Sequence, residues 1–451
     1  MTIPRRRFLA LAAATGASML SPARGASAAS IGALGLDATH LGLRPGSPDD
    51  QSETLQRAIE QAARNRSPLV LPPGSYRAAN IHLPSGAQLI GVRGGSRLVL
   101  SGGSSLLAAD GADHVTLYGL VLDGVKLPLP ERRGLLHLEH CHALRVTDCE
   151  LIASGGTGVF CDGVDGEVSG TSIAGAADVA LLSYDGEGLT IARNTISGAG
   201  NSGILVMRRR DGDDGTIIVD NRVENIDNRS GGDGQYGNGI NAFRAANVIV
   251  RGNRIRNCAY SGVRGNSASN IHIEGNAISH AGEVAIYSEF AFEGAVIAGN
   301  TVDGAETGVS VTNFNDGGRL AVVQGNIFRN LAPRPTRGPD IACGVGIHIE
   351  ADTAVSGNVV ENAAYAGITI GWGPYLRDVA VTANVVRKSG IGVIVSVVPG
   401  ASTTVVSDNV ISGSERGAII GMAWGRTVTG DLAKDGAGSY AHLTLSGNRV
   451  R

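Results

Sequence analysis

Aromatic side chains are scarce in this sequence. Phe, Tyr and Trp make up 4% of the 451 residues, whereas glycine alone occurs 66 times. A single large core of this size would normally need aromatic side chains to fill it. Here Val, Ile, Leu and Ala must do so, which suits a stack of many thin, similar layers. The composition therefore argues against one large core and favours a repeat architecture.

A membrane-spanning hydrophobic run is missing at the N-terminus. The apolar run at residues 8–20 is 13 residues long, too short to cross a bilayer. It overlaps Arg5-Arg6-Arg7-Phe8-Leu9, which fits the twin-arginine export pattern, and a small-residue cleavage site follows at Ala26-Ser27-Ala28. We predict a signal peptide at residues 1–28, the twin-arginine translocase as a partner during export, and a periplasmic or secreted mature protein without a membrane span.

An excess of positive charge is missing too. Loss of residues 1–28 removes four arginines and no acid, so the net charge changes from −3 to −7. This balance argues against a nucleic-acid partner, which usually needs a basic domain. Only three cationic residues are lysines. The rest are arginines, which suit binding of carboxylates through two hydrogen bonds.

Cysteines are few and odd in number. None of the five has CxxC spacing to another, which argues against a zinc or redox site. Cys149 and Cys161 fall at inward positions of the repeat described below, where we expect small buried hydrophobic residues. A disulfide between Cys141 and Cys149 after export is the alternative.

A helix and short strands are predicted before the repeats begin. The helical spacing is set by four apolar residues, Leu55, Ala58, Ile59 and Ala62. Asp50 with Glu53 three residues later predicts a capping box, and the helix should end before Pro68. Three short strands should follow, at residues 69–71, 81–83 and 88–91.

This passage, residues 49–91, resembles the entrance of pectate-lyase-like β-helix proteins. The resemblance rests on Asp49-Asp50, the amphipathic helix, the phrase Pro72-Pro73-Gly74-Ser75-Tyr76 and a strand ending in Gly91. It implies a helix laid across the open hydrophobic end of a solenoid. We assign residues 29–110 to this cap and the first coils.

A short unit recurs through residues 111–451. Its clearest copies lie between Gly239 and Asp352 and end in an apolar–x–apolar–x–Gly–Asn phrase, as at residues 248–253 and 271–276. The closest copies are 23–26 residues apart, too short for a strand plus a full helix, and the frame of leucine-rich repeats is absent. The spacing fits one turn of an all-β, right-handed parallel β-helix.

The asparagine that ends each phrase should have a structural role. We expect these side chains to stack at an inner corner and to bond to backbone and to one another, as asparagine ladders do. Cys149 and Thr171 take this position in earlier, degenerate coils. The positions are Asn194, Asn221, Asn253, Asn276, Asn300, Asn326, Asn358, Asn384, Asn409 and Asn448.

As a whole, the chain resembles the twin-arginine-translocated β-helix repeat proteins of bacteria, a family of unassigned function. The resemblance rests on the export signal, the repeats and phrases such as Gly237-Asn238-Gly239-Ile240-Asn241 and Gly371-Trp372-Gly373-Pro374-Tyr375. It implies a fold and a compartment, and no activity.

A second short strand in each coil begins with Gly-Val or Gly-Ile. Counting that glycine as zero, positions +1 and +3 are apolar or small and should point inward, so +2 and +4 point outward. In about five coils the outward residues are mostly polar: Asn241 and Phe243, Arg264 and Asn266, Tyr287 and Glu289, Ser310 and Thr312, and His348 and Glu350. We call these residues the polar strip.

The polar strip predicts chemistry on an acidic sugar chain. Coils stack about 4.8 Å apart, so Glu289 and Glu350, two coils apart, can approach the roughly 6.5–9.5 Å separation of an inverting glycosidase pair. Alternatively, Arg264 neutralises a uronate while Tyr287 or His348 moves a proton in a β-elimination. The candidate catalytic residues are Arg264, Tyr287, Glu289, His348 and Glu350.

Two long insertions, at residues 227–238 and 331–343, precede second strands and should wall the polar strip on one edge. Loops after the strands add aromatic and polar side chains that suit a sugar chain. The candidate substrate-binding residues are Asn241, Arg244, Asn266, Asn313, Arg319, Trp372 and Tyr375.

No cofactor is predicted. His140 and His142 would share one strand face, which permits a divalent metal site without supporting it. Residues 208–215 form a charged stretch without EF-hand spacing, and we expect a solvated turn there.

The sequence thus favours an exported protein that binds, and cleaves or modifies, an acidic (uronic-acid) polysaccharide in a lateral groove. A non-catalytic glycan-binding or envelope scaffold protein is the alternative. Lyase and hydrolase chemistry both remain open at this point.

Overall fold

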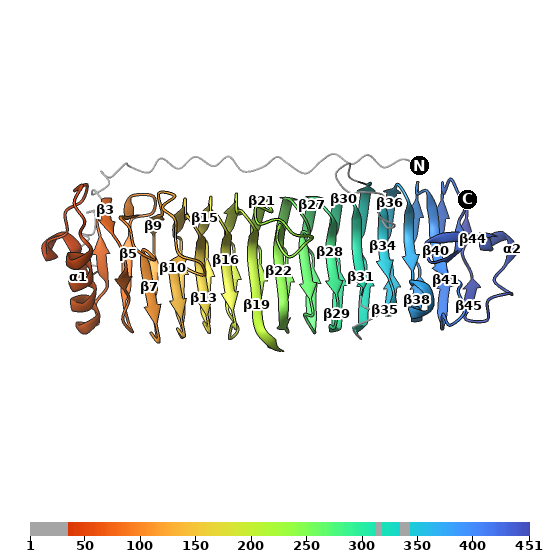
Figure 1. Ribbon diagram of the computed structural model, residues 1–451, viewed down its shortest axis with the longest axis horizontal. Helices are drawn as coiled ribbons and strands as arrows, with labels where there is room; N and C mark the ends of the chain where they lie inside the picture. The colour runs from red at the N-terminus through yellow and green to blue at the C-terminus, as the bar shows by residue number, and fades with distance from the viewer. Residues whose placement is uncertain (1–34, 313–317, 334–342) are drawn as a thin grey trace, which may run out of the picture.

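The computed structural model describes residues 35–312, 318–333 and 343–451. They form an elongated right-handed parallel β-solenoid with a helix at its N-terminal end (Figure 1). In the described residues, three sheets of 16, 15 and 15 strands run along the axis. All but one of these strands pair in parallel with the equivalent strand of a neighbouring coil, so the all-β, right-handed parallel β-helix predicted from the repeat is confirmed.

The first sheet, sheet A, begins near the N-terminus and contains, in spatial order, β1 (Leu36–Asp37), β2 (Leu69–Leu71), β5 (Gln88–Gly91), β8 (Thr116–Tyr118), β11 (Leu144–Thr147), β14 (Gly166–Ser169), β17 (Thr190–Ala192), β20 (Ile217–Val219), β23 (Ile249–Arg251), β26 (Ile271–Glu274), β29 (Glu293–Ala298), β32 (Arg319–Gln324), β35 (Ala351–Ser356), β38 (Arg377–Thr382), β41 (Thr404–Ser407) and β45 (Leu443–Ser446).

Sheet B follows sheet A in each coil and contains β3 (Gly74–Ala78), β6 (Ser96–Leu100), β9 (Leu120–Asp123), β12 (Glu150–Ile152), β15 (Ser172–Ala174), β18 (Thr195–Ser197), β21 (Arg222–Ile226), β24 (Arg254–Cys258), β27 (Ala277–Ala281), β30 (Thr301–Ala305), β33 (Ile327–Leu331), β36 (Val359–Ala363), β39 (Val385–Arg387), β42 (Val410–Ser412) and β46 (Arg449–Val450).

Sheet C completes the coil and faces the viewer in Figure 1. It contains β4 (Ile81–His82), β7 (Leu107–Asp110), β10 (Gly134–Glu139), β13 (Thr157–Asp162), β16 (Val179–Tyr184), β19 (Ser202–Asp213), β22 (Asn238–Ala246), β25 (Val263–Asn266), β28 (Val284–Glu289), β31 (Thr307–Thr312), β34 (Val345–Ile349), β37 (Ala366–Ile370), β40 (Ile391–Ser396), β43 (Ile419–Ala423) and β44 (Arg426–Asp431).

Helices are few and short in the described residues: η2 (Ala38–Leu41), α1 (Ser52–Arg64), η3 (Gly373–Tyr375) and α2 (Leu432–Asp435). None of them is long and apolar enough to cross a membrane. The predicted signal peptide, residues 1–28, lies outside the described residues and stays a prediction.

Helix α1 covers the N-terminal end of the stack, as predicted. Its four spaced apolar residues are buried in the common core. The predicted capping box is wrong, because Gln51 is the N-cap and makes no side-chain capping bond. Asp50 lies one residue too early, where its Oδ1 accepts from the Ser52 amide at 2.9 Å and its Oδ2 accepts from the Ser101 hydroxyl. Asp50 therefore joins the helix to the first coils.

The asparagine ladder is confirmed between sheets A and B. At each step one side-chain oxygen accepts both the backbone amide and the Nδ2 of the preceding asparagine. Asn276 Oδ1 accepts from Asn253 N and Nδ2 at 2.9 and 3.0 Å, and Asn276 Nδ2 also donates to Val250 O at 2.9 Å. In the degenerate coils, Thr171 Oγ1 accepts from the Cys149 amide at 3.3 Å. The ladder satisfies buried backbone groups that the corner would otherwise leave unpaired.

The interior is filled by aliphatic side chains, as the composition predicts. Cys149 and Cys161 are buried there, and burial raises the pKa of the Cys149 thiol to about 11. Cys141 and Cys149 are free thiols, so the alternative of a disulfide between them is wrong. Cys141 lies in the turn before sheet A and Cys149 in the ladder position after it, where each thiol donates to a nearby carbonyl.

Candidate functional site

The polar strip lies on the outside of sheet C in the predicted register. One column pairs Asn241, Arg264, Tyr287, Ser310 and His348 across successive strands. The second column pairs Asn266, Glu289 and Thr312, and Glu350 directly follows β34. The inward positions are fully buried, as at Ile240, Val263, Ile286 and Ile347. The alternation of residues along the strands therefore predicted correctly which side chains point inward and which point outward.

The polar strip is more covered than an outward face should be. Arg264, Glu289 and Glu350 are 9%, 3% and 2% exposed. Part of the cover over Arg264 is the insertion at residues 227–237, which lies over β25. Arg264 Nη1 donates to Gly234 O at 2.5 Å. A Cβ on Gly234, whose φ is +128°, would lie 1.9 Å from that nitrogen, so glycine is required for this contact.

The same insertion is fixed to the strands below it. Asn238 Nδ2 donates to Gly234 O at 2.9 Å, and the Tyr260 hydroxyl donates to Gly232 O at 2.8 Å. The insertion therefore folds onto the polar strip instead of standing beside it as a wall. Of the second insertion, residues 334–342 lie outside the described residues.

Arg264 and Glu289 form a buried ion pair between adjacent coils. Arg264 Nη2 and Nε lie 2.5 and 2.6 Å from Glu289 Oε1, and Asn266 Nδ2 donates to the same oxygen at 2.8 Å. Burial raises the pKa of Glu289, although the Arg264 charge and its hydrogen bonds oppose the rise. Asn266 was predicted to bind substrate, but in the structure it orients the Glu289 carboxylate.

Tyr287 lies beside this pair. Arg264 Cζ is 5.2 Å from the centroid of its ring, within the range of a cation–π contact. Burial, and then the negative charge of Glu289, raise the pKa of Tyr287 to about 12. The phenol is therefore protonated at neutral pH and can donate a proton, whereas it is a poor base.

A second cluster lies farther along the polar strip. His348 Nδ1 is 2.6 Å from Thr369 Oγ1, and His348 Nε2 is 3.4 Å from Glu350 Oε1. Thr369 was not among the predicted site residues, although it occupies the outward position next to His348 in the following coil. A histidine held between a hydroxyl and a carboxylate can accept or donate a proton. Ser310, on the coil between the two clusters, is 4% exposed.

The predicted binding residues do not all meet at the polar strip. Asn241 does, at 5% exposure, and its Oδ1 has no hydrogen-bond partner among the described residues. Arg244 is exposed and pairs with Asp211 at 3.4 Å. Arg319 starts β32 in sheet A and pairs with Glu293 instead. Asn313 lies outside the described residues.

An aromatic pair follows the polar strip toward the C-terminus. Trp372 and Trp424 meet edge to face, with ring centroids 6.1 Å apart and planes at 82°. They are the chain's two tryptophans, and Trp424 is 52% exposed. Tyr375, in η3, is 37% exposed. Trp372 and Tyr375 were predicted to bind substrate, whereas Trp424 was missed because β44 reverses direction there.

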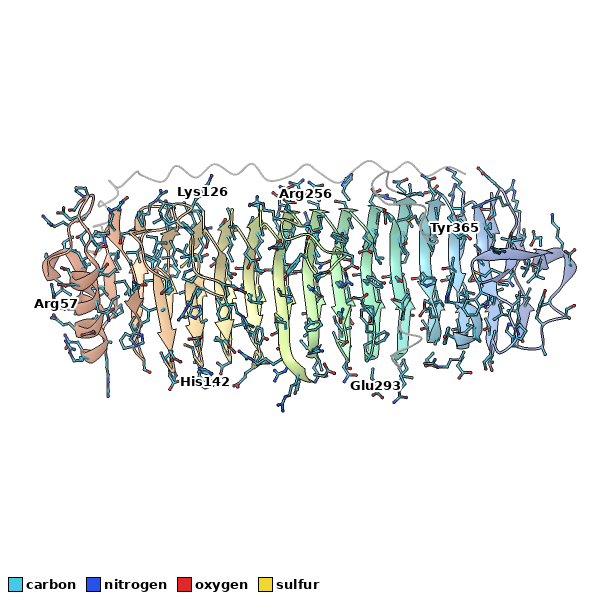
Figure 2. The ribbon with its side chains drawn as sticks, in the orientation of Figure 1. Arg57, Lys126, His142, Arg256, Glu293 and Tyr365 are labelled. Carbon is cyan, nitrogen blue, oxygen red and sulfur yellow. The ribbon has the colours of Figure 1, made fainter. Side chains whose placement is uncertain are left out.

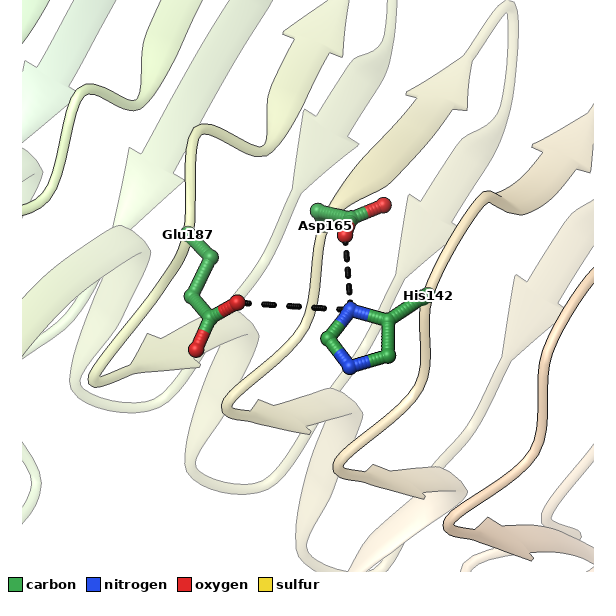
Figure 3. Close-up of side chains that lie close together, drawn as sticks. All are labelled: His142, Asp165 and Glu187. Atoms are coloured by element: carbon green, nitrogen blue, oxygen red, sulfur yellow. Dashed lines mark hydrogen bonds and ion pairs between the residues drawn. The ribbon is translucent and has the colours of Figure 1, made fainter.

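The predicted face shared by His140 and His142 is wrong, because both lie in the turn between β10 and β11. His140 Nδ1 contacts Asp110 at 3.2 Å. His142 instead meets Asp165 and Glu187 from the next two coils, at 2.8 and 4.0 Å (Figure 3). These three side chains offer metal-ligand atoms within 4.8 Å of one another. The hydrogen bond to Asp165 raises the pKa of His142, so a metal at Nδ1 would have to displace a firmly held proton.

Replacing His142 by Ala should destabilise the protein in a pH-dependent way. The stabilisation from a raised histidine pKa is fully present below about pH 6.5 and is lost as the pH rises through the raised pKa. Burial opposes ionisation of Asp165, but hydrogen bonds from Ala143 and His142 outweigh it and lower the pKa of Asp165. That contribution is present above about pH 3.8 and lost as the pH falls through the lowered pKa. We expect a larger loss near pH 5, where both contributions are present, than near pH 9, where only the one from Asp165 remains.

Urea unfolding of wild type and His142→Ala at both pH values measures this difference. The control is His140→Ala, since His140 pairs with Asp110, outside the group formed with Asp165 and Glu187. An equal loss at pH 5 and pH 9 would show that His142 stabilises the turn by packing and not by charge.

Comparison with known proteins identifies the fold family. Residues 108–236 and 211–386 match the family model described as the right handed beta helix region. The chain belongs to this family. Among curated protein sequences, none matches the chain.

Solved structures of similar shape are distant in sequence. The A-module of the mannuronan C-5 epimerase AlgE6 from Azotobacter vinelandii aligns at a TM-score of 0.52 and 14% identity, over 92% of this chain and 99% of that one. The catalytic unit of the GH87 α-1,3-glucanase from Streptomyces thermodiastaticus strain HF3-3 aligns at 0.51 and 16%, over 92% and 68%. Tailspike protein 3 of bacteriophage CBA120 aligns at 0.51 and 13%, over 92% and 61%. Such identities show a shared fold alone.

Proposed function

We propose that this right-handed β-helix protein binds an acidic polysaccharide along sheet C and transfers protons on it between the two clusters of the polar strip. The observation that supports this most is the covered, outward-facing arrangement of Arg264, Tyr287 and Glu289, with His348 and Glu350 two coils away. Solvated surface positions would leave such side chains exposed. Perturbed titratable groups that cluster under cover are typical of sites for chemistry.

The two clusters suit complementary steps of a β-elimination. His348, oriented by Glu350 and Thr369, would take the proton next to a uronate carboxylate. The electron pair left behind forms a C=C bond, and the glycosidic C–O bond breaks. Tyr287, protonated at neutral pH, would give its proton to the leaving oxygen. If the same two groups instead returned a proton to the other face of the carbon, the outcome would be epimerisation.

Similar folds support polysaccharide as the substrate class. The epimerase named above acts on mannuronan, and the other enzyme is a glucanase. The exposed side chains of Trp424 and Tyr375 can stack against sugar rings beyond the C-terminal end of the polar strip. The predicted twin-arginine signal adds the proposal that substrate and protein meet outside the cytoplasm.

Pure binding is the second candidate function. Arg264 donates through Nε and Nη2 to Glu289 and through Nη1 to Gly234 O. A substrate carboxylate would have to displace one of these partners. Because Arg264 already has these partners within the protein, the ion pair favours a glycan-binding or scaffold protein in which Arg264 and Glu289 have a structural role.

A screen of polygalacturonate, polymannuronate and polyguluronate tests both candidates. New unsaturated ends, or a changed uronate composition, would report chemistry. Tyr287→Phe and His348→Asn should each slow product formation by at least about a hundredfold. His142→Ala, outside the polar strip, should not change it.

Binding is followed separately through tryptophan emission, because Trp372 follows β37, the strand next to the end of the polar strip, and contacts Trp424. Quenching by a polymer without any product from wild type would establish the binding function and reject the enzyme. Neither quenching nor product with any of the three polymers would reject the proposed function altogether.

A further inference from the structure

Sheet B has a depression lined by arginines, on a different face from the polar strip. Its volume is about 520 Å³, and it spans β21, β24, β27, β30 and β33. Figure 2 shows Arg256 projecting from one long edge of the solenoid and Glu293 from the opposite edge. Three outward residues of the central strands are small, namely Ala277, Ser279 and Thr301. The depression exists because larger side chains stand on both sides of them.

Two of the arginines are direct neighbours on adjacent strands and have no ion-pair partner among the described residues. Arg222 and Arg254 are register partners in β21 and β24, which places their backbones about 4.8 Å apart. Neither forms an ion pair with any residue that the structure describes. Like charges directly opposite each other in a sheet are destabilising. Folding alone would therefore disfavour this arrangement.

Three other arginines of the same sheet, by contrast, are neutralised. Arg256 pairs with Glu224 at 2.5 Å, Arg329 with Asp303 at 2.9 Å, and Arg387 with Glu361 at 3.3 Å. The depression is thus lined by four arginines and two carboxylates, which leaves two positive charges. These two charges are those of Arg222 and Arg254, which lie at one side of the floor formed by Ala277, Ser279 and Thr301.

We propose that this depression binds an anionic sugar residue, with Arg222 and Arg254 holding its carboxylate or sulfate. A guanidinium group matches the geometry of either anion through paired hydrogen bonds. The Ser279 and Thr301 hydroxyls can bond to sugar hydroxyls. The volume falls within the usual range of small-ligand pockets.

The choice of a sugar as the ligand rests on the proposed function, but the site itself does not lie on sheet C. A chain held on sheet B would be anchored away from the polar strip. The protein would then contact acidic polysaccharide on two faces and could hold one chain while acting on another.

Calorimetric titration of the full chain with trigalacturonate at low salt tests this site. Arg222→Ala/Arg254→Ala should weaken one binding event by at least about tenfold, as loss of charge-assisted hydrogen bonds requires. The control is Arg387→Ala/Lys388→Ala, which removes the same charge at the end of β39 in the same sheet, beside Glu361. It should bind like wild type. Equal losses in both double variants would overturn the proposal in favour of general surface charge.

Two further probes separate the possible ligands. Maltotriose, a neutral trisaccharide, should not bind, and sodium sulfate should bind much more weakly than trigalacturonate. Sulfate binding as tight as that of the sugar would reduce the site to a simple anion site and overturn the sugar assignment. The two sites lie on different sheets, so the two proposals can fail separately. Loss of the calorimetric binding event with normal tryptophan quenching would count against the sheet B site. Loss of quenching with a normal calorimetric event would count against the proposed function on sheet C.

The fold of the variant is checked by its melting temperature, which should be no lower than that of wild type because a repulsion has been removed. If the variant is damaged, wild type still gives an answer through modification by phenylglyoxal. Bound trigalacturonate should protect Arg222 and Arg254 and leave Arg387 reactive. Equal modification with and without the sugar would overturn the proposal.

Discussion

Replacing Arg264 by Met should lower the free energy of unfolding by about 3–5 kcal/mol. The Glu289 side chain is only 4% exposed, so the substitution strands a carboxylate away from water with Asn266 as its main remaining partner. Adding Glu289→Gln should restore most of the loss, because a neutral amide tolerates burial. Urea unfolding of the two single variants and the double variant, followed by circular dichroism, measures the coupling.

An exposed pair provides the control for this cycle. Arg319→Met leaves Glu293 alone, but both side chains are at least half exposed, and water screens the remaining charge. We expect a loss below about 1 kcal/mol there. A similarly small loss for Arg264→Met would mean that water reaches Glu289. The ion pair would then have no special role in the polar strip.

The same variants separate stability from function. A buried ion pair is seldom the most stable solution, since well-packed neutral side chains often do as well. If Arg264→Met/Glu289→Gln is as stable as wild type but no longer binds or converts polysaccharide, the two charges are needed for polysaccharide binding or conversion and not for folding. If binding and product formation persist, the pair is part of the fold and the reaction belongs to other residues.

Replacing Asn276 by Ala should cost about 3–5 kcal/mol, as several buried groups lose partners worth roughly 1–3 kcal/mol each. The Asn253 amide loses its acceptor, Val250 O loses a donor, and Asn300 Oδ1 loses the Nδ2 that bonds to it. Asn276 itself is 1% exposed, so water cannot take its place. Urea unfolding, with hydrogen exchange of the Asn253 amide, measures the effect.

Threonine should be tolerated better than alanine at this position. The chain already uses Thr171 in the same structural position, where its hydroxyl accepts from the Cys149 amide. We therefore expect Asn276→Thr to cost about half as much as Asn276→Ala. Equal costs would show that the lateral bonds between asparagines, and not the bond from the backbone amide, stabilise the corner.

Periodicity explains which features the sequence predicted well. A ladder residue such as Asn253 meets the same neighbours in every coil, so one phrase repeated ten times defines its surroundings. Strand alternation likewise separates Ile286 from Tyr287 without any knowledge of distant residues. Both rules are local and physical, and the observed core and register follow them.

The features that sequence reasoning missed lie where the repeat is interrupted. The burial of Arg264 depends on the path of a glycine-rich insertion, and the repeat pattern does not predict the conformation of an insertion. The contact of Trp372 with Trp424 requires the antiparallel turn after β43, the one reversal among the described strand pairs. His140 and His142 were placed on a strand because alternation was extended into a turn. In each case a loop conformation, and not a repeated phrase, sets the neighbours.

The asparagine ladder also limits how such a protein can change its length. Within the ladder, each coil bonds only to the coils before and after it, so a whole coil can be gained or lost while every remaining ladder bond finds an equivalent partner. Removing residues 301–326, for example, would bring Asn300 into register with Asn358 and Tyr287 beside His348. Groups along sheet C can therefore move apart or together only in steps of one coil, about 4.8 Å. Point substitutions alter the chemistry of the face, whereas duplication or loss of coils alters its reach along a polymer, and the two can evolve independently.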